Sequence, residues 1–144
     1  MGMFDGIFNS GKSWTTPPSA SDPEKWKPEG NQRLATFGAG CYWGTEKFFA
    51  TDFAAMYPEG AILGTSVGFM SPNPKAMKNP SYSQVCSGSS GHVEVLHILY
   101  DSSLVSYEDM VKFFYTFHDP TTLNRQGNDR GTQYASIIFT HNDE

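Results

Sequence analysis

The sequence predicts an α+β domain, a two-layer sandwich in which the elements follow the split order β-α-β-β-α-β. Two observations lead to this prediction. Four short segments carry alternating or continuous apolar residues, as strands do. Two longer segments carry apolar residues at helical spacing, one after the first strand and one after the third. Elements in this order form a mixed or antiparallel sheet with helices on one face.

The first half of the chain predicts a strand, a helix, a second strand and a long loop, at residues 33–40, 41–56, 61–70 and 71–91. The first strand enters a glycine turn, after which the period changes to that of a helix. Phe48, Phe49 and Phe53 lie on neighbouring turns of that helix, which therefore has an apolar side to bury against the sheet.

The second half predicts a strand, a helix, a loop and a last strand, at residues 92–101, 105–119, 120–133 and 134–141. The third strand has apolar residues on both of its alternating faces, so we expect both to be covered. Ser106 is expected to cap the second helix, with Asp109 three residues further on. Its apolar stripe consists of Met110, Val111, Phe113, Phe114 and Phe117. The fold predicted is ferredoxin-like.

Residues 1–32 are expected to form an irregular N-terminal arm. The segment is rich in serine, threonine, proline and glycine, and its four prolines exclude a regular element. Trp14 and Trp26 are unusual in a tail, so we expect these indoles to hold the arm against the domain. A disordered leader is the alternative. Residues 33–144 are expected to form a single domain.

Composition excludes several classes of function. The chain of 144 residues is 38% apolar and 15% aromatic, as a folded globule is. Its net charge of −5, without a basic block, argues against nucleic acid as a partner. We find no apolar run of membrane-spanning length and no secretory signal. The two cysteines form neither a disulfide scaffold nor a zinc motif, so we expect no metal and a reduced, cytoplasmic protein.

Cys41 is the first candidate functional residue. It lies between glycines in "FGAGCYWG", at the predicted start of the first helix. A cysteine reacts as its thiolate, and the unpaired N–H groups at a helix N-terminus stabilise an anion. A small buried cysteine is the alternative and stays open. The glycine spacing misses the dinucleotide-binding fingerprint by one residue.

Three further candidates lie next to this cysteine or in the third strand. Tyr42 and Trp43 follow Cys41, and because adjacent helical residues point about 100° apart, only one of them can face the core. The other can form the wall of an apolar pocket, although a core position is the favoured alternative for Trp43. Glu94 is either a buried acid with a raised pKa or a solvated strand carboxylate.

The polar loops supply the remaining candidates. Tyr82, Asp129 and Tyr134 lie in loops of the kind that often carry sites, although such residues are also common in ordinary turns. Cys86 lies before the third strand and either resolves an oxidised Cys41 or packs. A cysteine–histidine pair is a further alternative. His92 is the candidate partner in such a pair, while most of the four histidines (His92, His97, His118 and His141) are expected to be structural.

Three separated stretches together resemble the motifs of class A peptide methionine sulfoxide reductases. They are "GCYWG", "NPSYSQVCSGSSGHVEV" and "QGNDRGTQYAS", in family order over about residues 34–140. The resemblance implies that Cys41 attacks the sulfoxide sulfur of oxidised methionine, that methionine departs, and that Cys41 becomes a sulfenic acid. It implies that Glu94 protonates the sulfoxide oxygen, and that Tyr82 and Tyr134 hydrogen-bond to that oxygen.

The resemblance also implies a substrate site and partners. Trp43 would hold the substrate methyl group, with Tyr42 in the place of the family's usual phenylalanine, and Asp129 matches a position associated with substrate anchoring. The S epimer would be the substrate, in oxidised proteins or as the free amino acid. Neither metal nor cofactor is implied. Thioredoxin or another dithiol would be the reductant of a monomeric enzyme whose catalytic domain is 33–144.

Recycling stays open at this point. The family's recycling cysteines usually lie in a C-terminal tail, and the sequence ends before one. Cys86 matches a position that is not usually the resolver. Two rival functions also stay open: a cysteine hydrolase that uses Cys41 with a histidine, and a module that binds methionine sulfoxide without turning it over.

Overall fold

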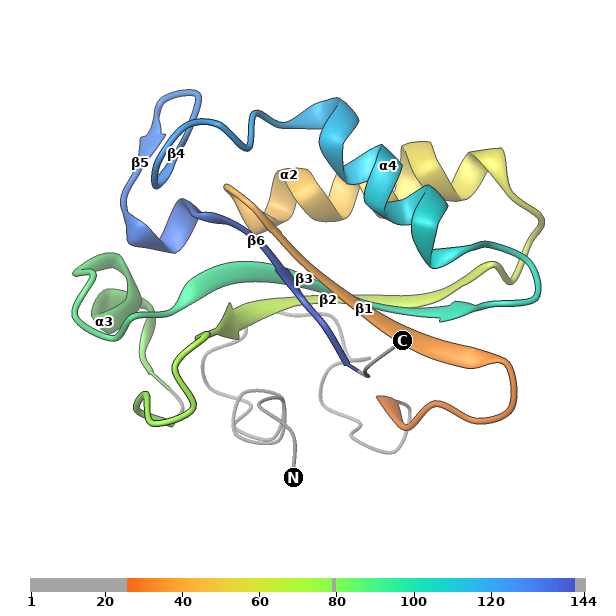
Figure 1. Ribbon diagram of the computed structural model, residues 1–144, viewed down its shortest axis with the longest axis horizontal. Helices are drawn as coiled ribbons and strands as arrows, with labels where there is room; N and C mark the ends of the chain where they lie inside the picture. The colour runs from red at the N-terminus through yellow and green to blue at the C-terminus, as the bar shows by residue number, and fades with distance from the viewer. Residues whose placement is uncertain (1–25, 79, 142–144) are drawn as a thin grey trace.

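A computed structural model describes residues 26–78 and 80–141 of the chain (Figure 1). The elements in order are β1 (Gln32–Ala39), α2 (Tyr42–Lys47), the π-helical η3 (Phe48–Phe53), the 3₁₀ turn η4 (Ala54–Met56), β2 (Ile62–Met70), α3 (Tyr82–Cys86), β3 (Val93–Asp101), α4 (Tyr107–Phe117), β4 (Arg125–Gln126), β5 (Asp129–Arg130), the 3₁₀ turn η5 (Thr132–Tyr134) and β6 (Ser136–Phe139).

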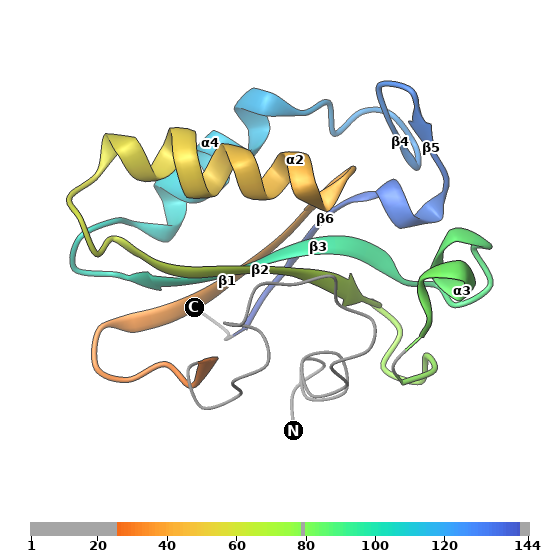
Figure 2. The same ribbon diagram turned by 180° about the vertical axis from the view of Figure 1, so that it is seen from behind.

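The sheet has the strand order β2-β3-β1-β6, and every neighbouring pair is antiparallel. Helices α2 and α4 cover the same face of the sheet (Figures 1 and 2). The mixed α/β class and the four main strands were therefore predicted correctly. The last strand begins at Ser136, later than predicted. The two predicted loops also contain short elements, namely α3 in the first and the β4–β5 ladder in the second.

Aromatic side chains fill the space between the sheet and the helices. Phe37 on β1 lies at the centre, with its ring 5.1 Å from that of Phe49 and 5.1 Å from that of Phe114. Leu96 and Ile98 of β3 are fully buried in the same core. Because side chains alternate along a strand, Glu94 lies on this helix-covered face too.

The predicted first helix runs through three kinds of helical turn. Cys41 is the N-cap of α2, and the chain continues as η3 and η4 without leaving the helical region. Phe49 and Phe53 are both buried on η3, as the spacing of the phenylalanines predicted. Phe48 is half-buried and stacks on Phe117 of α4, which joins the two helices at their outer side.

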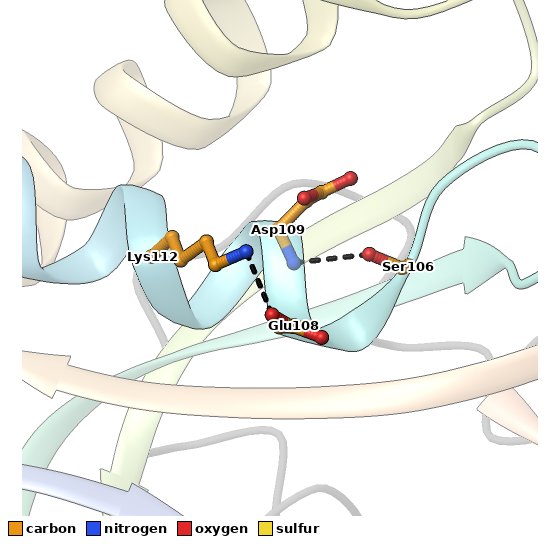
Figure 3. A network of polar contacts seen from close by, with 4 residues as sticks. All are labelled: Ser106, Glu108, Asp109 and Lys112. Carbon is orange, nitrogen blue, oxygen red and sulfur yellow. Dashed lines mark hydrogen bonds and ion pairs between the residues drawn. The ribbon is translucent and has the colours of Figure 1, made fainter.

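Helix α4 begins as the sequence predicted. The Ser106 hydroxyl accepts a hydrogen bond from the Asp109 backbone N–H at 3.0 Å, the contact expected of an N-cap (Figure 3). One turn along, Lys112 pairs with Glu108 at 2.7 Å, but both side chains are exposed, so this ion pair contributes little. Met110 and Phe114 are buried against the sheet.

The opposite face of the sheet carries a polar cluster. The Thr36 hydroxyl is 2.7 Å from His97 Nδ1 and 2.9 Å from His141 Nε2. Trp26 is buried, with its ring 4.8 Å from that of His97. Trp26 therefore packs on the sheet as expected, whereas the expectation for Trp14 lies outside the described residues.

Candidate active site

Cys41 is positioned by the turn between β1 and α2. Gly40 has φ +88°, and a Cβ there would lie 2.7 Å from the Cβ and Cγ of Gln126, so the position requires glycine. The Cys41 thiol is half-buried and forms no disulfide. The Cys41 carbonyl accepts hydrogen bonds from the N–H and the hydroxyl of Thr45. The alternative of a fully buried cysteine is wrong.

Glu94 comes from β3 and reaches the backbone next to Cys41. Its Oε2 accepts a hydrogen bond from the Tyr42 N–H at 3.0 Å, and the residue is only 2% exposed. Burial raises the pKa of Glu94 to about 7; the Tyr42 N–H lowers this pKa and the Asp129 carboxylate raises it. The alternative of a solvated carboxylate is therefore wrong. A nearly buried acid, part protonated near neutral pH, lies beside the residue after the thiol.

Two tyrosines, Tyr134 and Tyr82, lie near the Glu94 carboxyl group. Tyr134 is half-buried on η5, and its pKa is raised by burial first, then by the nearby charges of Glu94 and Asp129 and by the two thiols. Tyr82 is largely exposed on α3. Its pKa is raised chiefly by Cys86 as hydrogen-bond partner of its hydroxyl, and further by Glu94 and Tyr134. Segments far apart in the sequence thus meet at one end of the sheet (Figure 1).

The two aromatics after the cysteine have opposite environments. Tyr42 is buried, 5.8 Å between ring centroids from Phe69 of β2. Trp43 is 46% exposed and meets the Tyr42 ring edge-on at 5.3 Å. The favoured alternative, a core position for Trp43, is wrong, because Tyr42 is the residue of the pair that is buried in the core. An exposed indole next to the thiol is available for contact with a ligand.

Phe69 is a residue of the site that the sequence did not indicate. It pairs with Glu94 across β2 and β3, and its ring lies 6.2 Å from that of Tyr82 as well as against Tyr42. It is fully buried and therefore connects the beginning of α2 to α3. No local sequence pattern distinguishes Phe69 from the other buried phenylalanines of this chain.

Asp129 lies on β5 and is exposed. β5 contacts η5, which carries Tyr134, and the Asp129 carboxylate adds to the raised pKa of Glu94. Cys86, expected in a loop, is instead the last residue of α3 and is exposed, so packing does not account for it.

The histidines are engaged away from Cys41. Nδ1 of His92 lies 3.0 Å from the Ser90 carbonyl, and burial lowers the pKa of this histidine. His118 bonds to the Phe114 carbonyl and to the Ser136 hydroxyl. With His97 and His141 in the cluster around Thr36, the cysteine–histidine pair with His92 is not formed among the described residues.

Residues 26–78 and 80–141 contain no group of three or more histidine, cysteine, aspartate or glutamate side chains that could hold a metal ion. No helix in that part of the chain is long and apolar enough to cross a membrane.

The profile of a known family matches this chain over residues 33–144, and the family is described as peptide methionine sulfoxide reductase. The chain belongs to the peptide methionine sulfoxide reductase family. The match includes the turn at Cys41, the β3 strand with Glu94 and the loops with Asp129 and Tyr134.

Individual relatives agree. The chain is 48% identical over 116 residues to peptide methionine sulfoxide reductase MsrA 1 of Nostoc sp., a match that covers 81% of this chain and 65% of the relative. It is 46% identical over 114 residues to MsrA of Methanococcus maripaludis, covering 79% of this chain and 66% of the relative. The chain therefore spans slightly less than two thirds of the length of these relatives.

Solved structures of the family share the fold. Methionine sulfoxide reductase A of Corynebacterium diphtheriae superposes with a TM-score of 0.68 at 36% identity, over 80% of this chain and 50% of that one. Reduced Mxr1 of Saccharomyces cerevisiae gives a TM-score of 0.67 at 35% identity, over 81% and 64%.

Proposed function

We propose that this protein reduces methionine S-sulfoxide to methionine through a sulfenic acid on Cys41. The observation that carries the proposal is the position of the Glu94 carboxyl group, which is buried and accepts a hydrogen bond from the Tyr42 N–H. Burial raises the pKa of this group to about 7. A group with that pKa can donate a proton near neutral pH while holding a fixed position beside the thiol. Membership of the family supports the choice of substrate.

The reaction transfers one oxygen atom between two sulfurs. The Cys41 sulfur attacks the sulfoxide sulfur, and Glu94 protonates the sulfoxide oxygen, which is otherwise a poor leaving group. The sulfoxide sulfur gains the two electrons that the Cys41 sulfur loses. The sulfur–sulfur bond formed in the attack then breaks as methionine leaves, and the oxygen passes from the methionine sulfur to Cys41, which becomes a sulfenic acid. The proton lost by the Cys41 thiol replaces the one that Glu94 donated. The half-buried thiol and the nearly buried acid support this division of roles.

The phenols of Tyr134 and Tyr82 would hydrogen-bond to the sulfoxide oxygen. Their raised pKa values keep both hydroxyls protonated and able to donate at neutral pH. Both lie near Glu94, as a shared oxygen acceptor requires. The Tyr82 hydroxyl has to exchange its partner Cys86 for the substrate oxygen, which the exposure of this side chain supports.

Substrate binding would use the exposed indole of Trp43 for the methyl group, with the buried Tyr42 ring behind it. Asp129, exposed on the hairpin beyond Glu94, would anchor the backbone of a bound residue. A methyl contact on one side and oxygen donors on the other distinguish the two epimers at sulfur, which supports selection of the S form. The substrates would be oxidised proteins and free methionine sulfoxide.

The fold, the domain boundaries, the cellular location and the reductant are further parts of this proposal. The strand order β2-β3-β1-β6, with helices on one face, supports a ferredoxin-like split βαβ fold. Residues 33–144 would form the catalytic domain behind an N-terminal arm of residues 1–32. Two cysteines without a disulfide support a reducing, cytoplasmic setting with thioredoxin or another dithiol as reductant, and the enzyme would act as a monomer.

A single turnover without reductant tests the proposal. Reduced protein is mixed with N-acetylmethionine S-sulfoxide, and the sulfide formed is quantified. One equivalent per chain is expected from the wild type and none from Cys41→Ser, while the R epimer should give none. Retained sulfide formation by Cys41→Ser would remove the nucleophile assignment. Acylation of Cys41 by an ester, with no sulfide formed, would favour a hydrolase instead.

A further inference from the structure

Cys86 is a second thiol at the same end of the molecule as Cys41. The sequence has only these two cysteines. Cys86 ends α3, is exposed and is not joined in a disulfide. It has the Tyr82 hydroxyl as its partner, one helical turn earlier on α3. The mechanism proposed above gives this thiol no task.

The segment that carries Cys86 packs against an element of the candidate active site. Helix α3 packs against η5, and a Cβ on Gly88, two residues after Cys86, would lie 3.3 Å from the Thr132 hydroxyl. Thr132 begins η5, which ends with Tyr134. The thiols of Cys86 and Cys41 both add to the raised pKa of the Tyr134 phenol. The Phe69 ring links the two cysteines, because it lies 5.8 Å from the ring of Tyr42, the residue after Cys41, and 6.2 Å from the ring of Tyr82, one turn before Cys86.

We propose that Cys86 is the resolving cysteine, whose thiol condenses with the Cys41 sulfenic acid to form an intramolecular disulfide. The inference rests on the proposed function, because that reaction supplies the sulfenic acid. In the condensation the sulfur–sulfur bond forms and the Cys41 sulfur–oxygen bond breaks. The Cys86 proton leaves with that oxygen as water. A dithiol reductant then reduces the disulfide and restores both thiols by exchange.

Helix α3 has little buried surface that would hold Cys86 in a fixed position. A disulfide requires the two Cα atoms to come within about 7 Å. The helix has five residues, and only Val85 among them is buried. A capping box between Ser81 and Gln84 closes its first turn. Gly88 follows with φ +78°, a conformation in which glycine is unstrained. Elements with few buried side chains open at lower cost than the core, and opening of α3 would carry Cys86 with it.

The test is a peptide map after one turnover. Reduced protein receives one equivalent of N-acetylmethionine S-sulfoxide without reductant. The sample is then quenched, its remaining thiols are alkylated, and it is digested with trypsin without reduction. Trypsin leaves Cys41 in peptide 34–47 and Cys86 in peptide 79–112, because no lysine or arginine interrupts either. The expected product is these two peptides joined, with both free thiols lost for each sulfide formed.

The matched control is Cys86→Ser, which keeps a small polar group beside Tyr82. It should still form one equivalent of sulfide but accumulate a sulfenic acid on peptide 34–47 that dimedone traps. Wild-type protein that forms sulfide yet keeps Cys86 alkylatable, with dimedone on Cys41, overturns this inference alone. A disulfide between two chains, seen as a dimer on a non-reducing gel, overturns it too. If neither protein forms sulfide, the proposed function itself has failed.

Discussion

Replacing Glu94 by glutamine should change stability in a way that depends on pH. Glutamine keeps the shape of the side chain and an oxygen that can accept the Tyr42 N–H, but it does not ionise. The pKa of Glu94 rises from its ordinary value of 4.5 to about 7 in the fold. The folded state therefore holds the proton more tightly than the unfolded state, and wild-type stability falls as pH rises from 4.5 to about 7. The difference corresponds to about 3 kcal/mol.

Urea denaturation of both proteins from about pH 4 to about pH 8 measures this effect. The free energy of unfolding of Glu94→Gln minus that of the wild type should rise by about 3 kcal/mol over the range. Other titrations are common to both proteins and cancel. Glu108→Gln, which removes an exposed carboxylate from α4, is the matched control and should move by less than about 1 kcal/mol. A difference for Glu94→Gln that stays constant with pH would refute the raised pKa.

Three further predictions concern the surroundings of the site and the framework. Gly40→Ala should destabilise the protein by at least roughly 1–2 kcal/mol in denaturation, because alanine is strained at φ +88° and its Cβ meets Gln126; wild-type stability would contradict the turn geometry. Ser106→Ala should cost about 1 kcal/mol through loss of the bond to the Asp109 N–H, with turnover unchanged. Trp43→Ala should leave the melting temperature nearly unchanged, since the indole is 46% exposed. Its KM should rise about tenfold with a smaller change in kcat, and an unaltered KM would exclude Trp43 from the substrate site.

Sequence periodicity was enough to predict the main elements. The strands and α4 have clear periods, and the Ser106 cap is a local rule that tertiary contacts did not alter. Helix α3 was missed because five residues show no period, although the pair Ser81 and Gln84 is a capping-box signal that could have indicated it. The β4–β5 ladder has two residues per strand, which is too short for any pattern to register.

The site was predictable only in part. Glycine spacing placed Cys41 correctly at a helix start. Strand alternation gave the face of Glu94 but not what covers it, so its burial required the packing of α2 above β3. For Tyr42 and Trp43 the sequence required one to face inward without indicating which, and the choice of Trp43 was wrong. Contacts such as Phe69 with Tyr42 depend on tertiary structure and leave no local signal.

The most direct test of the central claim is the pH dependence of sulfide formation in a single turnover. If protonated Glu94 supplies the proton, the ratio of the wild-type rate to the Glu94→Gln rate should fall about tenfold per pH unit once pH exceeds about 7, the pKa of this carboxyl group, because ionisation of Cys41 affects both proteins alike. Glu94→Gln should form sulfide slowly, and its rate should show no decrease that follows the ionisation of residue 94. A wild-type rate that stays level or rises up to about pH 9, with Glu94→Gln equally fast, would contradict the account.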